Sequence, residues 1–148
     1  MFRHILVAAD GSPTAQRALQ EAIDIARTQQ ARLTIMTVAP PVPTLMPVAG
    51  GDPRAVSETN EHWAGEVLRA ALATVPDGVD VHTVIRTGHA THEIVEEITQ
   101  GGYDLVVVGS RGRGAARAGV LGSVNGAVHF HTHVPLLSIS LPDEHPTA

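Results

Sequence analysis

Glycine and serine residues cluster in two short segments near the end of the chain that could hold a phosphate. Gly109-Ser-Arg-Gly112-Arg-Gly114 directly follows the apolar run Leu105 to Val108, and Gly122-Ser123 lies ten residues after Gly112. Glycines allow backbone N–H groups to approach an anion closely. A helix that begins at Ser123 would add the positive end of its dipole. The spacing therefore favours a phosphate cradle between a strand and a helix.

An acidic residue, Asp10, follows the first apolar run of the chain, Ile5 to Ala9. The next residues suit the start of a helix, with Ser12 as the N-cap and Pro13 at the first helical position. At the end of a buried strand, Asp10 could face the glycine segments and act on a phosphate or its metal ion. It could equally be a turn or capping residue, and Ser123 could likewise be only a helix cap. The residue types alone leave these alternatives open.

Alternating strand and helix signals extend along the whole chain. Apolar runs or alternation predict strands at 5–9, 32–38, 79–85, 103–108 and 136–141, and helical spacing predicts helices at 13–26, 56–75, 90–98 and 123–131. Strands joined by helical crossovers must run parallel. We expect one α/β domain over 1–148 with an open parallel five-stranded sheet, a long loop at about 39–55 and a short tail at 142–148. Ligands of such sheets bind beyond the carboxyl ends of the strands, where the strand order reverses.

Composition excludes several kinds of site. The chain has no cysteine, which excludes thiolate metal sites, and its ten basic residues are all arginine. A Walker-type loop needs a lysine and is therefore excluded. The glycine pattern follows the fourth strand rather than the first, which also excludes the dinucleotide fingerprint. A net charge of −5 disfavours non-specific nucleic-acid binding. The first apolar run is too short for a secretory segment or a membrane span, so we expect a cytoplasmic protein.

Three histidines, His129, His131 and His133, alternate near the end of the last predicted helix. Residues two apart do not share a helix face, although His129 and His133 could meet if the helix extends. Cationic side chains also suit a helix C-terminus. We expect no metal site there, and the sequence leaves the role of the cluster open.

The chain resembles the universal stress protein family over nearly its whole length. The resemblance is carried by Ile5-Leu-Val-Ala-Ala-Asp10-Gly-Ser12, Arg86-Thr-Gly88, the segment from Tyr103 to Gly114, and Gly122-Ser123-Val124. The spacing Gly109-x2-Gly112-x9-Gly122-Ser123 is similar to that of the branch of the family that binds ATP. The resemblance implies strand order 3-2-1-4-5 and a homodimer through the last strand. The apolar residues of that strand, Leu136, Leu137, Ile139 and Leu141, favour the same contact, because an uncovered apolar edge is a liability.

The same resemblance implies a role for each matching position. Asp10 would lie near the ribose and the phosphates or their Mg²⁺ or Mn²⁺, and the backbone of Val38 would contact adenine. Gly109 and Gly112 would border the ribose and phosphates. Gly122, Ser123, Val124 and Asn125 would begin the helix over the phosphates, although the family usually has a small hydroxyl residue where this chain has Asn125. We expect Ala8 and Val108 to complete the site.

Three functions are compatible with these residues. The first is an ATP-binding regulator or sensor of stress without fast catalysis. The second is a slow ATPase in which Asp10 holds a divalent metal. The third is an interaction protein that acts independently of nucleotide, in which the glycine loop is only structural.

Overall fold

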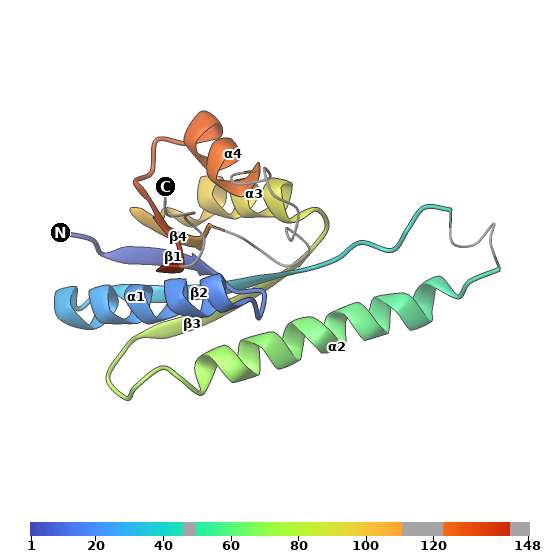
Figure 1. Ribbon diagram of the computed structural model, residues 1–148, viewed down its shortest axis with the longest axis horizontal. Helices are drawn as coiled ribbons and strands as arrows, with labels where there is room; N and C mark the ends of the chain where they lie inside the picture. The colour runs from blue at the N-terminus through green and yellow to red at the C-terminus, as the bar shows by residue number, and fades with distance from the viewer. Residues whose placement is uncertain (46–49, 111–122, 143–148) are drawn as a thin grey trace.

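Strands and helices alternate along the chain, as the sequence predicts. The computed structural model describes residues 1–45, 50–110 and 123–142. Its strands are β1 (His4–Ala8), β2 (Arg32–Ala39), β3 (Val81–Thr87), β4 (Leu105–Gly109) and β5 (Leu136–Ile139). Its helices are α1 (Pro13–Gln29), α2 (Pro53–Leu72), α3 (Ala90–Gly101) and α4 (Ser123–His131), arranged as in Figure 1.

The five strands form one parallel sheet in the order β3-β2-β1-β4-β5, which confirms the predicted fold class. The central strand β1 pairs with β2 on one side and with β4 on the other. Ile5, Leu6 and Val7 of this strand are completely buried, as expected for a strand covered on both faces.

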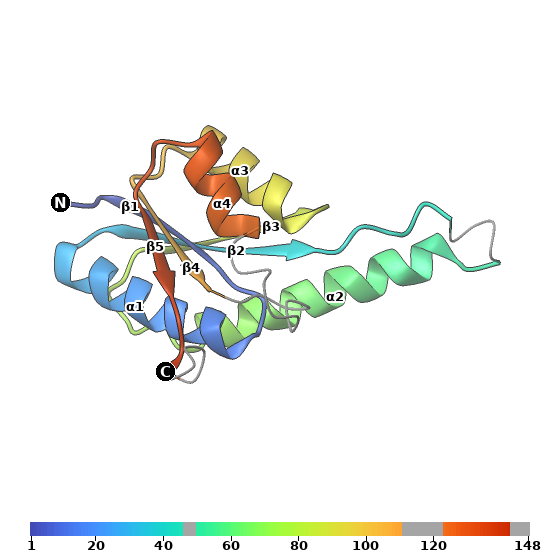
Figure 2. The ribbon, with the colours of Figure 1, turned by 45° about the horizontal axis from the view of Figure 1, so that its top comes forward.

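Helices cover both faces of the sheet, two on each. Figures 1 and 2 show α1 and α2 on one face and α3 and α4 on the other. Two apolar clusters fill the spaces between the layers. One joins Leu19 and Leu68 to Ile35, and the other joins Ile98 and Val128 to Leu6. The strand order thus reverses between β1 and β4, because the helices that follow these two strands lie on opposite faces.

The start of α1 agrees with its sequence signals. Ser12 is the N-cap, its Oγ accepts a hydrogen bond from the backbone N–H of Ala15 at 3.2 Å, and Pro13 opens the helix. The helical stripe predicted from the sequence is buried, and it comprises Ala15, Ala18, Leu19, Ala22, Ile23 and Ala26. This stripe holds α1 against β1 and β4, next to the expected site.

Several predicted boundaries differ from the observed ones, and the structure gives the reason for two of them. α2 begins at Pro53, three residues before the predicted start, because Asp52 caps it by accepting from the backbone N–H of Arg54 at 3.0 Å. β5 ends at Ile139, so Leu141 lies beyond the strand. The neighbouring strand β4 ends at Gly109, which pairs with Ile139. Beyond this pair β4 offers no further residue for β5 to pair with, so β5 ends there as well.

The first half of α2 extends well beyond the sheet in both views, together with the segment that follows β2 (Figures 1 and 2). The buried residues of this helix, Ala64, Leu68 and Ala71, all lie in its second half. Within the described part of the chain, no helix is both long enough and apolar enough to cross a membrane.

Candidate functional site

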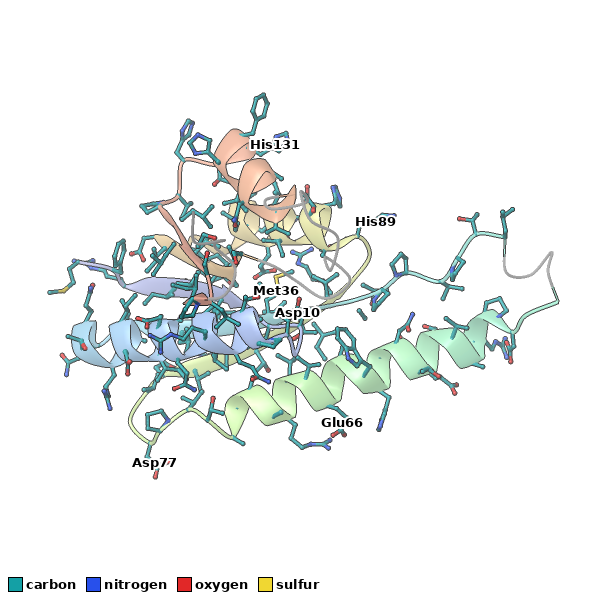
Figure 3. The ribbon with its side chains drawn as sticks, viewed as in Figure 1. Asp10, Met36, Glu66, Asp77, His89 and His131 are labelled. Atoms are coloured by element: carbon teal, nitrogen blue, oxygen red, sulfur yellow. The ribbon has the colours of Figure 1, made fainter. Side chains whose placement is uncertain are left out.

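The carboxyl ends of β1 and β4 meet at the point where the strand order reverses. The two strands pair in register from Ile5 with Leu105 to Val7 with Val107, so Asp10 and Gly109 emerge at the same edge of the sheet. Figure 3 marks Asp10 just past β1, beside Met36 of β2. Ligands of open parallel sheets bind in the crevice outside such a reversal. The fold therefore brings Asp10 and the start of the first glycine segment, Gly109, to the same edge of the sheet.

The turn after β1 is built by Asp10 and Ser12. Asp10 is partly buried, and its Oδ1 accepts a hydrogen bond from the backbone N–H of Ser12 at 2.9 Å. Ser12 in turn caps α1. The turn role considered for Asp10 is therefore real, whereas the cap of α1 is Ser12, and the turn fixes a carboxylate close to the N-terminus of α1. A carboxylate held in this way can also serve a metal ion bound to a nucleotide.

Gly109 lies against the first turn of α1. A Cβ at this position would fall 2.7 Å from Thr14 Oγ1 and 2.8 Å from the backbone nitrogen of Ala15. Such distances are shorter than real carbon contacts, so the close approach of β4 and α1 requires glycine. Ser110 follows, 5% exposed, and its N–H donates to the carbonyl of Ile139 at 2.7 Å. The missing side chain at Gly109 thus serves the packing of the helix, a role that the sequence analysis did not identify.

Ala8, Val38 and Val108 lie on the face of the sheet that α3 and α4 cover, where all three belong to one apolar cluster. Val108 is 2% exposed, while Ala8 and Val38 are only partly buried. Ala8 and Val38 thus leave apolar surface next to the carboxyl edge, and Val108 lies buried in the same cluster. An aromatic base could rest on such a surface.

α4 positions Val124 and Asn125 differently. Val124 packs into the cluster beneath α3 and α4. Asn125 turns toward the neighbouring strand, and its Nδ2 donates to Ser138 Oγ of β5 at 2.9 Å. Its Oδ1 is screened from solvent and has no hydrogen-bond partner among the described residues. The structure therefore places the Asn125 amide against β5.

Some of the predicted site residues lie outside the described residues. They are Gly112 and Gly122. For Ser123 the structure describes the backbone, which begins α4, and not the side chain. No group of three or more His, Cys, Asp or Glu side chains that could hold a metal ion occurs within residues 1–45, 50–110 and 123–142. Asp10 remains the candidate metal ligand, which fits Mg²⁺ bound mainly through substrate phosphates rather than in a protein cage.

Arg86 anchors α3 to the edge strand β3, a role the sequence analysis did not predict. Its Nε donates to Glu97 Oε2 at 2.8 Å, and its Nη1 donates to Glu93 Oε2 at 3.2 Å. Its Nη2 donates to Gln100 Oε1 at 2.8 Å. Glu97, and after it Glu93, raises the pKa of Arg86 by hydrogen bonding. Because Arg86 pairs in register with Val38, this cluster holds α3 next to the apolar surface described above.

Tyr103 extends the cluster toward β1. Its hydroxyl donates to Glu97 Oε1 at 2.7 Å, and burial together with this bond raises the pKa of Tyr103 to about 12. The ring of His4 lies 4.3 Å from the Tyr103 ring, and His4 Nε2 is 3.0 Å from Thr34 Oγ1. The pKa of His4 is lowered, mainly because burial disfavours the imidazolium. Arg86 and Tyr103 belong to two segments that carry the family resemblance, and no local pattern in the sequence links them to Glu97.

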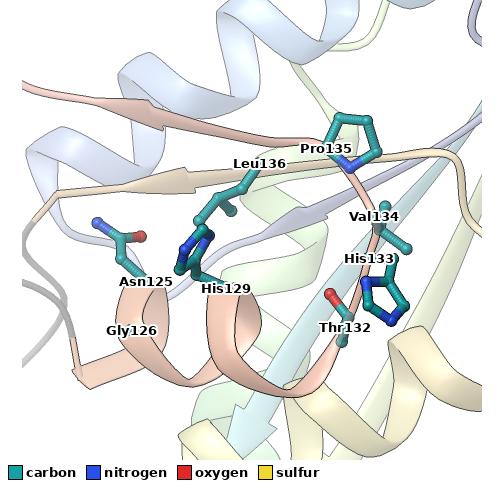
Figure 4. A pocket seen from close by; sticks show the side chains of 8 residues that line it. All are labelled: Asn125, Gly126, His129, Thr132, His133, Val134, Pro135 and Leu136. Atoms are coloured by element: carbon teal, nitrogen blue, oxygen red, sulfur yellow. The ribbon is translucent and has the colours of Figure 1, made fainter.

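A hollow of about 700 Å³ lies between α4 and the start of β5 (Figure 4). Asn125 and His129 line it from the helix, while His133 and Pro135 line it from the connection to β5. Phe130, next to His129, is 84% exposed. The hollow thus places two of the three clustered histidines beside an edge strand of the sheet.

Comparison with known proteins agrees with the fold and the order of the motifs. The model of the universal stress protein family matches residues 1–140. The chain belongs to the universal stress protein family. Universal stress protein YxiE of Bacillus subtilis is 31% identical over 94% of this chain and 99% of its own length.

Solved structures of universal stress proteins share the fold. UspA from Lactobacillus plantarum superposes with a TM-score of 0.78 at 26% identity, covering 93% of this chain and 97% of that one. A universal stress protein in complex with cAMP superposes with a TM-score of 0.60 at 25% identity, covering 93% and 96% of the two chains. The strand order implied by the resemblance to universal stress proteins is thus confirmed by the structure and by its neighbours.

Proposed function

We propose that this universal stress protein binds an adenine nucleotide, ATP with a divalent metal ion, and regulates a stress response without fast catalysis. The observation that carries the proposal is the meeting of Asp10 and Gly109 on paired strands whose following helices lie on opposite faces. The relative in complex with cAMP supports an adenine nucleotide as the ligand class.

The residues at this edge suit the parts of such a ligand. The apolar surface at Ala8 and Val38, with Val108 buried behind it, suits the base. Asp10 suits Mg²⁺ or Mn²⁺ on the phosphates, and the ion would supply charge neutralisation there. In this proposal Gly112, Gly122 and Ser123 contact the phosphates, as the family spacing implies.

Rapid hydrolysis is not part of the proposal. In-line attack on the γ-phosphate needs a water molecule that a side chain orients, and it also needs groups that stabilise the charge that develops on the phosphate. The Asp10 carboxylate already accepts the Ser12 N–H and, in this proposal, also serves the metal. A slow ATPase is the second candidate, because the carboxylate of Asp10 lies at the expected phosphate edge.

We also propose a homodimer formed through β5. The strand is an edge of the sheet, and Leu136, Leu137 and Ile139 leave it without a charged residue. An uncharged edge is open to pairing with another strand. Pairing with a second copy would cover it.

Equilibrium dialysis tests the nucleotide-binding proposal. The full chain is dialysed against labelled ATP with millimolar Mg²⁺, and mass spectrometry identifies any nucleotide that copurifies. Asp10→Asn should lower ATP retention, whereas Asp77→Asn should not, because Asp77 is exposed in the turn after α2 (Figure 3). No retained nucleotide in the unmodified protein would contradict the proposal and favour a role independent of nucleotide. Single-turnover hydrolysis well above background, lost in Asp10→Asn, would favour the ATPase.

A further inference from the structure

The first half of α2 continues past the carboxyl edge of the sheet, the edge at which the nucleotide is proposed to bind (Figures 1 and 2). Val67 of this helix lies beside the turn after β1, because a Cβ built on Gly11 would be 3.8 Å from Val67 Cγ2, an ordinary contact distance. Two turns earlier in the helix, Asn60 Nδ2 donates to the carbonyl of Pro40 at 2.9 Å, just after the end of β2. These two contacts anchor α2 to the exits of β1 and β2.

Trp63 lies between these two contacts on the same face of the helix. It follows Asn60 by three residues and precedes Val67 by four, and side chains at these spacings are neighbours on a helix surface. Glu66 lies on the other side of the helix and points away from the sheet in Figure 3. The indole is thus directed toward the space beyond the ends of β1 and β2. Asp10 borders the same space, because it belongs to the turn that Val67 contacts.

Packing in the core does not account for Trp63. An indole buries a large apolar area, so a tryptophan on an amphipathic helix commonly anchors a core. The residues of α2 that belong to the apolar cluster under α1 and α2 are Val67, Leu68 and Ala71, all further along the helix. Neither apolar cluster of the described residues includes Trp63, although this residue is partly buried. The indole therefore lies outside the core and beside the proposed site.

We propose that Trp63 forms the wall of the nucleotide site on the α2 side and contacts the adenine base. The inference depends on the proposed nucleotide binding and adds to it a residue that contacts the base. Ala8 and Val38 leave apolar surface on the face of the sheet that α3 and α4 cover, whereas α2 covers the other face. A base that lies beyond the strand ends thus meets apolar side chains from both layers.

The chemistry of the indole separates its role from that of Asp10. Stacking of a base on an aromatic side chain strengthens binding about tenfold or more. Trp63 is uncharged, so its contact does not depend on the phosphates, which Asp10 and its metal ion serve in the proposed function. The two residues therefore act on different parts of the nucleotide.

Fluorescence of the full chain tests the contact directly. The chain has one tryptophan, so tryptophan fluorescence reports Trp63 alone. Saturation with AMP should lower the constant for quenching by acrylamide about twofold or more, because a stacked base covers one face of the ring. Ribose 5-phosphate lacks the base and should leave the quenching constant unchanged. The measurement uses the unmodified protein, so it decides the question even where a variant fails to fold.

Titration calorimetry with AMP and ATP tests the contribution of the ring to binding. Trp63→Leu should weaken binding of both nucleotides about tenfold or more, and Trp63→Phe, which keeps an aromatic ring, less than about threefold. Leu72→Ala is the matched control, because Leu72 lies at the opposite end of α2, is 39% exposed, and should not affect binding. Circular dichroism verifies that each variant is folded.

The outcomes separate this inference from the proposed function on which it depends. Retention of ATP in dialysis without any change in acrylamide quenching overturns the role of Trp63 and leaves nucleotide binding intact. Equal protection by ribose 5-phosphate, or equal losses of affinity in Trp63→Leu and Trp63→Phe, overturns the contact with the base. Failure of the unmodified protein to retain any nucleotide overturns both proposals.

Discussion

The Arg86 guanidinium and the Glu97 carboxylate join the edge strand β3 to α3, with Nε and Oε2 2.8 Å apart and the two side chains only 22% and 12% exposed. The pair belongs to a cluster that reaches Glu93 and Gln100 on the same helix and Tyr103 before β4. A charge pair shielded to this extent is costly to break from one side, because the remaining charge loses its partner without regaining full hydration.

Replacing Arg86 should therefore destabilise the protein. We expect Arg86→Met to lower the free energy of unfolding by about 2 to 3 kcal/mol, since it leaves the carboxylates of Glu93 and Glu97 largely buried without their cation. Arg69→Met is the matched control, because Arg69 pairs with Glu66 on the exposed side of α2, with the two side chains 75% and 48% exposed. Arg69→Met should lower the free energy of unfolding by no more than about 0.5 kcal/mol. Urea unfolding followed by circular dichroism measures both, and equal losses would contradict the structural role of Arg86.

Alkaline unfolding should depend on Tyr103. Its pKa of about 12 in the folded protein lies above the ordinary 10.0, so the stabilising effect is complete below pH 10 and is lost as the pH rises toward 12. The rise of the pKa from 10.0 to about 12 corresponds to about 2 to 3 kcal/mol in the free energy of unfolding, which is lost once Tyr103 ionises. The chain has one tyrosine and no lysine, so absorbance at 295 nm follows this group alone, with no lysine titrating in the same range.

Tyr103→Phe should be less stable than the unmodified protein at pH 8, because Glu97 loses a donor, and should lose less stability between pH 10 and 12. A tyrosine that titrates near 10 in the folded protein would contradict the buried hydrogen bond to Glu97.

Gly109→Ala should be destabilising even without nucleotide. The new methyl group would lie 2.7 Å from Thr14 Oγ1 and 2.8 Å from the Ala15 nitrogen, so β4 and α1 must separate, at a cost of about 1 to 3 kcal/mol. Gly65→Ala is the control, since a Cβ there meets no atom within 4 Å inside α2 and should stabilise by about 0.5 to 1 kcal/mol. Thermal unfolding of the nucleotide-free chain measures both. An unchanged melting temperature in Gly109→Ala would show that the close approach is not needed.

Local sequence signals predict this fold well where they act over a few residues. Ser12 and Pro13 predict the start of α1, and the alternation of helix and strand signals predicts a parallel sheet. The Arg86 cluster could not be predicted in this way, because His4, Arg86, Glu97 and Tyr103 meet only after α3 has crossed back over the sheet. Tertiary contacts of this kind leave no periodic pattern in the sequence.

The sequence likewise predicted some features of the candidate site and missed others. The resemblance to universal stress proteins placed Asp10 and Gly109 at one edge, which the strand pairing bears out. The sequence could not reveal that the glycine at 109 is required by the approach of α1, since a phosphate contact and a helix contact need the same small residue. The length of β5 depends on where β4 ends, and a pattern of leucines alone therefore predicts a strand that is too long.

The role proposed for Asp10 predicts a difference between nucleotides. If Asp10 holds a metal ion on the phosphates, Asp10→Asn should weaken ATP binding in the presence of Mg²⁺ by about tenfold or more, because a charged ligand of the ion is lost. Binding of AMP should change by less than about threefold, since AMP lacks the chain of phosphates that the ion bridges. Chelation of Mg²⁺ by EDTA should weaken ATP binding in the unmodified protein and should affect Asp10→Asn much less. Titration calorimetry with both nucleotides measures these effects, and equal losses for ATP and AMP would assign Asp10 to the turn at Ser12 alone.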